Sequence, residues 1–88
     1  MNNLIFSPSA WDEYLYFQMQ DKKTLKRINA LLRDTVRDPF DGIGKPEPLK
    51  YRENCMSRRI DAKNRLVYEV SGDRDILIIS CRGHYNDN

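Results

Sequence analysis

Residues 57–68 constrain the fold more than any other stretch, because they have the pattern of two short strands joined by a tight polar turn. Val67 and Tyr68 supply the β-branched and aromatic side chains that favour strands. Arginine occurs on both arms of this hairpin, as Arg58, Arg59 and Arg65. A guanidinium on a rigid sheet is a permanently charged, forked donor that suits phosphate. Exposed strand faces also commonly carry arginine, so the hairpin alone fits a cationic solvent face better, with acidic partners nearby in Glu53, Asp61 and Glu69.

The length and composition predict one domain, spanning residues 1–88, with a single core. A chain with 40% hydrophobic and 32% charged residues is typical of a soluble globular protein. The longest apolar run, residues 76–79, has the length of a strand, and the N-terminus lacks the pattern of a secretion signal. We therefore expect a cytoplasmic protein without membrane contact, in which Cys55 and Cys81 are reduced thiols that form no metal-ligand spacing.

The distribution of charge is more informative than the net charge of +2. Residues 1–43 balance six basic against six acidic side chains, whereas residues 44–85 carry nine basic and six acidic ones, a local excess of +3. Nucleic-acid binding by bulk charge normally needs a stronger excess. The excess is nevertheless sufficient for a small site with a few placed cations.

Two helices are predicted in the first half of the chain. Ser7 and Pro8 have the residue types of an N-cap and a first helical position. Asp21 caps a second helix over residues 22–37, which Pro39 ends. This helix has an apolar stripe and a basic remainder, which fits either a solvated face or contact with an acidic partner or an RNA backbone. The aromatic residues of the first helix form more apolar surface than one helix face can bury, which indicates an interface in addition to core packing: Trp11, Tyr14, Tyr16 and Phe17.

Strands are predicted before the first helix and after the second. A short opening strand covers residues 4–6, and three further strands cover residues 51–60, 65–71 and 76–83. The short connections favour an α+β fold of order β-α-α-β-β-β, with both helices packed on one face of a twisted antiparallel sheet. The other face of the sheet is then free.

Glu47 lies in a loop that prolines stiffen. Residues 39–50 contain two glycines and three prolines, which excludes regular structure. Pro46 and Pro48 flank Glu47 and narrow its backbone conformations on both sides. A glutamate in a surface loop is usually unremarkable, but this double constraint favours a positioned carboxylate.

A carboxylate, three cations, an imidazole and a phenol can meet at the free face of the sheet: Glu47, Lys50, Arg59, Arg65, His84 and Tyr85. A lone histidine is more often structural than catalytic. Together, however, these groups fit metal-independent RNA cleavage, in which a base activates the ribose 2′-OH, cations stabilise the phosphorane and an acid protonates the departing 5′-oxygen. Because the nucleophile belongs to the substrate, the scheme needs no catalytic serine or cysteine, no metal and no cofactor.

Several motifs, in order and covering almost the whole chain, resemble the YoeB/Txe branch of the RelE-type toxins of bacterial toxin–antitoxin pairs. They are Asp-Glu-Tyr-Leu-Tyr-Phe (12–17), Gly-Lys-Pro-Glu-Pro-Leu-Lys (44–50), Ser-Arg-Arg-Ile (57–60), Arg-Leu-Val-Tyr (65–68) and the terminal His-Tyr (84–85). The resemblance implies a RelE-like fold and a toxin that acts as an endoribonuclease (an mRNA interferase), inhibiting translation by cutting mRNA in the A site of the 70S ribosome. It also implies a cognate YefM/Axe-like antitoxin that masks the active site, operator DNA bound only through the antitoxin complex, and the capacity to form a homodimer.

The resemblance further assigns roles to the clustered residues. Glu47 matches the general base of the family, His84 the general acid and Arg65 the phosphate-stabilising arginine. The remaining matches are two supporting cations and a tyrosine that helps to place the substrate: Lys50, Arg59 and Tyr85. Arg58 has the opposite strand parity to Arg59, so we expect it to face away as a structural or partner-binding residue.

An alternative function is that of a catalytically weak module that binds its antitoxin and acts in a DNA-binding autoregulatory complex. All the expected catalytic positions are occupied, which favours the enzyme.

Overall fold

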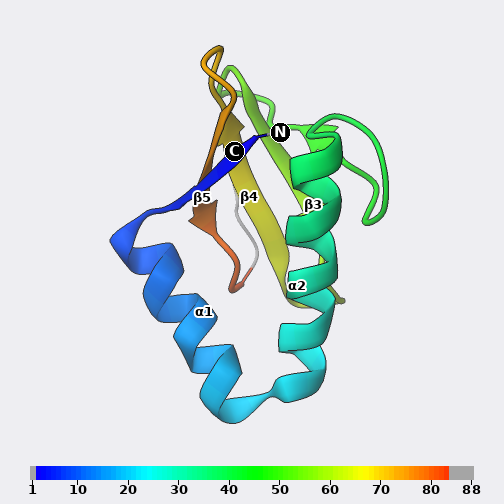
Figure 1. Cartoon of the computed structure of the whole chain (residues 1–88). Helices are drawn as coiled ribbons and strands as arrows, with labels where there is room; N and C mark the ends of the chain where they lie inside the picture. The colour runs from blue at the N-terminus through cyan, green and yellow to red at the C-terminus, as the bar shows by residue number, and fades with distance from the viewer. Residues whose placement is uncertain (1, 84–88) are drawn as a thin grey trace.

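The computed structural model describes residues 2–83, and His84 and Tyr85 therefore lie outside the described residues. Figure 1 shows a helical hairpin against a sheet. The elements in chain order are β1 (Asn3–Phe6), α1 (Pro8–Gln20), α2 (Lys22–Arg37), β2 (Glu47–Pro48), β3 (Cys55–Arg59), β4 (Arg65–Val70) and β5 (Asp75–Ser80). Neither helix of this described part is long and apolar enough to cross a membrane.

Both helices begin at the predicted caps. The Ser7 hydroxyl accepts a hydrogen bond from the Ala10 N–H at 3.1 Å, and Pro8 opens α1. The Asp21 carboxylate accepts from the Thr24 N–H at 3.1 Å and starts α2, whose predicted range of 22–37 is confirmed. The exposed Tyr14 hydroxyl ties the two helices together by donating to Asn29 Oδ1 at 2.7 Å.

The sheet has the strand order β1-β5-β4-β3-β2 and confirms the predicted fold class, with one difference. Strands β2 to β5 pair antiparallel, but β1 pairs parallel with β5, so the sheet is mixed. A short turn forces neighbouring strands to run in opposite directions. No turn connects β1 to β5, because all the other elements lie between them in the chain, so their relative direction is set by packing.

The bounds of the strands also differ from the expectation, and the strand predicted over residues 76–83 covers Asp75–Ser80 instead. The strand predicted over residues 51–60 begins only at Cys55, because Asn54 adopts a left-handed conformation with φ of 62° in the preceding turn. The proline-rich loop, expected to lack regular structure, contributes the two-residue strand β2 at the sheet edge. An edge position tolerates Pro48, which has no N–H to donate.

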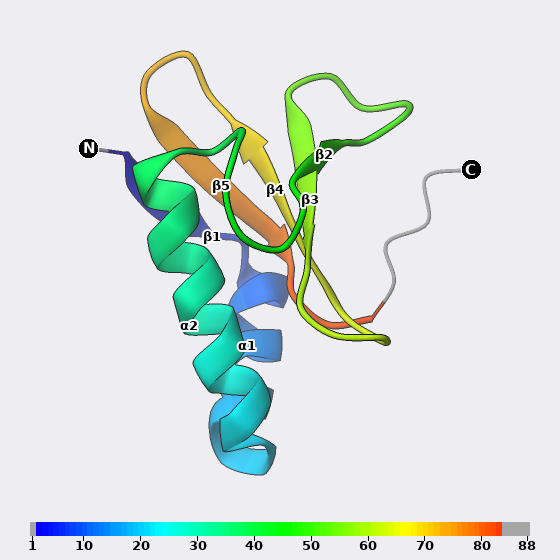
Figure 2. The same cartoon turned by 90° about the vertical axis from the view of Figure 1, so that its right-hand side faces the viewer.

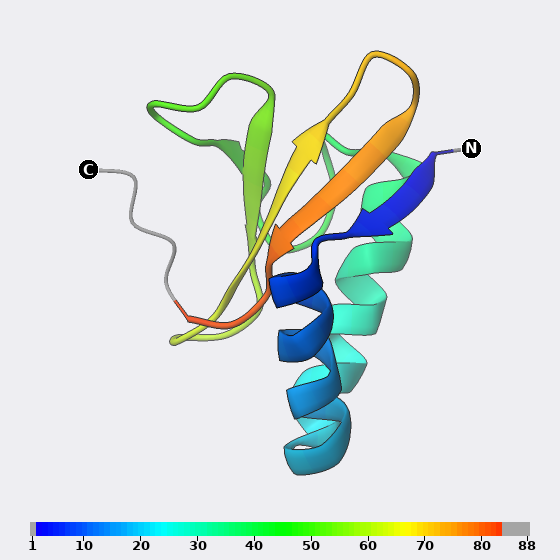
Figure 3. The same cartoon turned by 90° about the vertical axis from the view of Figure 1, so that its left-hand side faces the viewer.

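The helices cover one face of the sheet and leave the other face open, as Figures 2 and 3 show from two sides. Side chains alternate between the faces of a strand. The core between sheet and helices includes Met56 of β3 and Leu66 and Tyr68 of β4. Residues of the opposite parity, among them Ser57 and Arg65, therefore belong to the open face.

Candidate functional site

The open face brings together a carboxylate, a guanidinium and a hydroxyl from three adjacent strands. Arg65 Nη2 of β4 lies 3.0 Å from Glu47 Oε1 of β2. The same guanidinium donates from Nε and Nη2 to Ser57 Oγ of β3, at 3.1 and 3.0 Å. The Arg65 side chain is only 18% exposed, whereas the Glu47 side chain is 65% exposed. The arrangement therefore offers an accessible proton acceptor beside a fixed, forked anion binder.

Strand register explains why these residues meet. Glu47 pairs with Ser57 between β2 and β3, and Arg59 pairs with Arg65 between β3 and β4. The Leu49 N–H also donates to the Cys55 carbonyl at 2.9 Å, which extends the contact of the proline-rich segment with β3. Glu47, which the sequence places in a loop, is therefore part of the short strand β2 at the edge of the sheet.

Gly44 anchors the other end of this segment. Its carbonyl accepts from the Arg59 N–H at 2.7 Å, and its φ of 79° lies in the region that favours glycine. A Cβ at this position would lie 2.7 Å from a methyl carbon of Leu31 in α2. Only a glycine allows the loop to approach α2 this closely. The segment before Glu47 is therefore held by β3, through the Gly44 carbonyl, and by its packing against α2.

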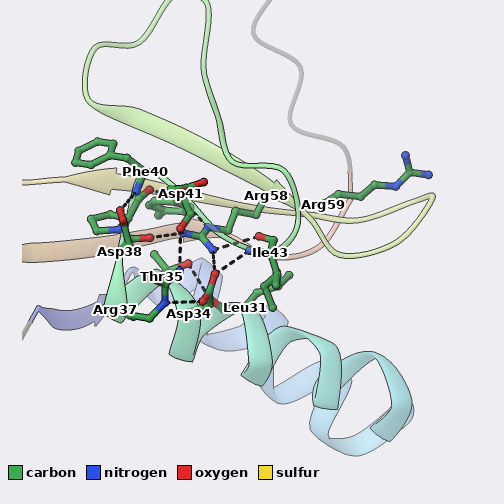
Figure 4. Close-up of polar contacts among 12 residues, drawn as sticks. Leu31, Asp34, Thr35, Arg37, Asp38, Phe40, Asp41, Ile43, Arg58 and Arg59 are labelled. Atoms are coloured by element: carbon green, nitrogen blue, oxygen red, sulfur yellow. Dashed lines mark hydrogen bonds and ion pairs between the residues drawn. The ribbon is translucent and has the colours of Figure 1, made fainter.

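Arg58 confirms the parity prediction, since it points to the helix side and is fully buried. Figure 4 shows it surrounded by α2 and the following loop. It donates to Asp34 Oδ2 at 2.7 Å and to the Tyr68 hydroxyl at 3.0 Å. It also donates to three backbone carbonyls of the loop, those of Asp38, Asp41 and Ile43.

The acidic partner of Arg58 differs from those expected for the hairpin. The sequence suggested three acids that are near it in the chain, whereas the partner is Asp34, 24 residues away on α2. Tertiary packing alone brings the two together. Arg58 thereby fastens the loop that leads to the site and is a structural residue.

Hydrogen bonds to Asp34 strongly favour its charged form. The Arg37 side chain and the Ile43 N–H, together with Arg58, lower the pKa of Asp34 from 3.8 to about 2. Burial acts in the opposite way on the thiols: it raises the pKa of Cys55, and raises that of Cys81 to about 12. Both cysteines are free, buried and poor nucleophiles, as packing residues should be.

Of the other predicted site residues, the structure describes Arg59 and Lys50. Arg59 is exposed, and in Figure 4 its side chain extends away from the Arg58 cluster. Lys50 is exposed in the bend that follows β2. His84 and Tyr85 lie outside the described residues, and their predicted roles stay predictions. Across residues 2–83, no group of three or more His, Cys, Asp or Glu side chains could hold a metal ion.

Two residues of this region were not singled out as contacts from the sequence. Ser57 is the hydroxyl against which Arg65 is fixed, and its shared parity with Arg59 is the signal that could have identified it. Asn64 accepts a hydrogen bond from the Gly83 N–H at 2.7 Å, while the Arg65 N–H donates to the Gly83 carbonyl at 3.1 Å. The last described residue is therefore bound to the start of β4, beside Arg65.

Comparison with known proteins identifies relatives along almost the whole chain. Residues 6–85 match the family described as the YoeB-like toxin of bacterial type II toxin–antitoxin systems. The toxin YoeB of Synechocystis is 58% identical over 83 residues, which cover 93% of this chain and 95% of the relative.

Solved structures of such toxins have the same fold. A YoeB/ParE toxin from Agrobacterium tumefaciens superposes with a TM-score of 0.90 at 45% identity, covering 94% of this chain and 99% of that one. A YoeB dimer from Staphylococcus aureus gives 0.87 at 48% identity, with 96% and 98% covered. A YoeB–YefM complex from the same organism gives 0.85 at 47% identity, with 97% and 99% covered.

Proposed function

Since the chain belongs to the YoeB-like toxins of bacterial type II toxin–antitoxin systems, we propose that it is an endoribonuclease that cleaves mRNA in the ribosomal A site. The observation that carries this proposal is the Glu47–Arg65 pair on the open face of the sheet, with the Arg65 guanidinium fixed by Ser57. An exposed carboxylate beside a preorganised guanidinium suits a reaction that needs a base and a stabilised phosphorane.

The reaction begins with proton transfer from the ribose 2′-OH to Glu47. The 2′-oxygen then attacks the adjacent phosphorus, and Arg65 stabilises the added negative charge. A phosphate that occupies the Arg65 fork replaces the Glu47 carboxylate there, which frees this carboxylate to accept the proton. The Glu47 side chain is largely exposed to solvent, so its ion pair with Arg65 is weak. Little free energy therefore opposes replacement of the carboxylate by a phosphate.

The second half of the reaction breaks the bond to the 5′-oxygen. His84 donates the proton that the departing 5′-oxygen requires, and the products are a 2′,3′-cyclic phosphate and a 5′-hydroxyl. Lys50 and Arg59 add positive charge around the phosphate, and Tyr85 helps to place the substrate. No step requires a metal ion or a cofactor, because the attacking group is the hydroxyl of the substrate.

The family also supplies the expected partners. The Staphylococcus aureus relative is solved as a complex of YoeB with YefM, and we propose a YefM/Axe-like antitoxin for this chain. Operator DNA is then bound only through the antitoxin complex. The translating 70S ribosome presents the mRNA, which places the reaction in the cytoplasm.

An exposed aromatic surface on α1 favours a homodimer as well. Phe17 is buried, but Trp11 is 47% and Tyr16 39% exposed, and Met19 is 77% exposed beyond them. A dimer of the Staphylococcus aureus relative has been solved. Sedimentation over a range of protein concentrations tests this proposal, and a monomer at every concentration would reject it.

The proposed activity is tested with purified chain and mRNA-programmed ribosomes. We expect cleaved mRNA with a 5′-hydroxyl end, and no cleavage when the ribose at the cut carries 2′-O-methyl in place of 2′-OH. Glu47→Gln and His84→Gln should each slow cleavage by about 10²- to 10⁴-fold. Arg65→Ala should slow it by about 10²- to 10³-fold.

Lys26→Ala on α2 is the matched control for Arg65→Ala, because it also removes one cation but lies away from the site. Equal effects of the two substitutions would indicate general electrostatic binding in place of a catalytic site. Expression without an antitoxin provides the cellular test: the parent chain should arrest growth, and Glu47→Ala and His84→Gln should not. Absence of arrest by the parent chain would favour the binding module.

A further inference from the structure

Two consecutive residues hold the backbone of Gly83, one at its N–H and one at its carbonyl. Its N–H donates to Asn64 Oδ1 at 2.7 Å, and its carbonyl accepts from the Arg65 N–H at 3.1 Å. Arg65 is also the residue whose side chain holds Glu47. Asn64 and Arg65 together therefore contact Glu47, the proposed base, and Gly83, the residue that precedes His84 in the sequence.

Asn64 is itself rigidly placed. Its side-chain Nδ2 donates to both oxygens of the Asp61 carboxylate, at 3.1 and 3.2 Å. Its backbone carbonyl accepts from the N–H groups of Ile60 and Asp61, at 3.0 and 3.2 Å. The Asp61 carboxylate in turn accepts from the N–H groups of Lys63 and Asn64, both at 2.8 Å. The turn thus presents the Asn64 oxygen to Gly83 in a fixed orientation.

The residues before Gly83 have further anchors on α1. The Cys81 N–H donates to Glu13 Oε1 at 2.8 Å, and the Arg82 guanidinium lies 3.5 Å from the centre of the Tyr16 ring. The chain is therefore tied down at three successive residues, and Asn64 provides the last side-chain contact before position 84. Gly83 has a φ of 84°, which accommodates the change of direction at this point.

We propose that Asn64 is a positioning residue, which fixes Gly83 against β4 and through this anchor supports the proton donation proposed for His84, the next residue in the sequence. This inference rests on the proposed function. Asn64 touches neither the phosphate nor the 5′-oxygen and acts only through Gly83. Without the Asn64 side chain, the Gly83 carbonyl keeps its contact with the Arg65 N–H, but the Gly83 N–H loses the hydrogen bond that orients it. Small displacements of a proton donor reduce rates strongly, because the reacting atoms must be aligned.

The test compares single-turnover cleavage by Asn64→Ala in the parent chain and in His84→Gln. We expect Asn64→Ala to lower the rate at saturating ribosome–mRNA complex by about tenfold, with an apparent Kd within about twofold of the parent. In the His84→Gln background the same substitution should change the rate by less than about twofold, because the group it positions is gone. Asn29→Ala is the control for loss of an asparagine side chain that is hydrogen-bonded away from Gly83, since Asn29 accepts from the Tyr14 hydroxyl, and it should leave the rate unchanged.

Rescue distinguishes positioning from a general loss of stability. In Asp61→Asn/Asn64→Asp the donor and acceptor of the side-chain pair are exchanged, so that residue 64 still accepts from Gly83 and residue 61 still accepts from the turn. This double variant should recover most of the cleavage rate lost in Asn64→Ala. Equal rate losses from Asn64→Ala with and without His84 would overturn the proposal, as would no recovery in the double variant.

Amide exchange measures the contact independently of cleavage. The Gly83 N–H should exchange with solvent at least about tenfold faster in Asn64→Ala than in the parent chain and in Asn29→Ala. Unchanged exchange would refute the role of Asn64 even if the chain cleaves RNA. If the parent chain cleaves no RNA, the proposed function fails, whereas faster exchange would still uphold the contact of Asn64 with Gly83.

Discussion

Replacing Asp34 by alanine should destabilise the fold far more than loss of an ordinary surface acid. Asp34 is the only carboxylate bound to Arg58 among the described residues, and the Arg58 side chain is fully buried. Removing one partner of a buried ion pair leaves an uncompensated charge and typically costs about 3–5 kcal/mol. Arg58 keeps the Tyr68 hydroxyl and three backbone carbonyls, so we expect the lower end, about 3 kcal/mol.

This loss is a large part of the roughly 5–15 kcal/mol that stabilises a small domain. Urea unfolding followed by tryptophan fluorescence measures it, and with an m-value of about 1–2 kcal/mol/M the midpoint should fall by about 2 M. Arg37→Ala is the control, because it removes the exposed member of a second ion pair with the same carboxylate, at 3.0 Å. A surface pair of this kind contributes about 1 kcal/mol or less. If Asp34→Ala destabilises no more than Arg37→Ala, the buried pair does not hold the loop.

The pH dependence of the same variant gives a second check. The pKa of Asp34 in the folded protein is about 2, below its ordinary value of 3.8, because its hydrogen bonds favour the charged form. Its stabilising contribution is therefore complete above the ordinary pKa and is lost as the pH falls through the folded pKa. The difference in unfolding free energy between the parent chain and Asp34→Ala should shrink between about pH 5 and pH 2. A difference that stays constant over this range would contradict the assigned ionisation.

Three further expectations concern the site and its supports. Ser57→Ala removes the hydroxyl that holds the Arg65 guanidinium at 3.0–3.1 Å, so ribosomal mRNA cleavage should fall by about tenfold while the urea midpoint changes little; an unchanged rate would show that Glu47 alone orients Arg65. Gly44→Ala forces a Cβ to within 2.7 Å of a Leu31 methyl carbon at a φ of 79°, and its melting temperature should drop by more than about 8 °C; a drop under about 2 °C would show that the loop relaxes. The Cys81 thiol is buried with a pKa of about 12, so iodoacetamide should label it only after unfolding, as mass spectrometry of the native and denatured chain can establish.

Local patterns were sufficient to predict most of the elements. Serine and aspartate caps fix where the helices start, and the apolar stripe of α2 together with Pro39 fixes its range. Alternation along β3 and β4 separated Arg58 from Arg59, because successive side chains of a strand point to opposite faces. These signals are contained within a few residues of chain, so they can be read without knowledge of the fold.

Contacts between distant segments required the tertiary structure. The parallel pairing of β1 with β5, the Asp34–Arg58 ion pair and the Gly83–Asn64 hydrogen bond each join residues that no local pattern relates. The structure also converts Glu47 from a loop residue into part of an edge strand, where it meets Arg65 at 3.0 Å.

The amino-acid sequence by itself determined which groups the protein has for its chemistry and on which strand faces they can lie. The tertiary structure alone decided which of these groups touch and which side chains hold them in place. The physical reason is one of range. Residue identity and backbone periodicity set the conformation of a few neighbouring residues, whereas the distance between Glu47 and Arg65 depends on the register of the three strands β2, β3 and β4.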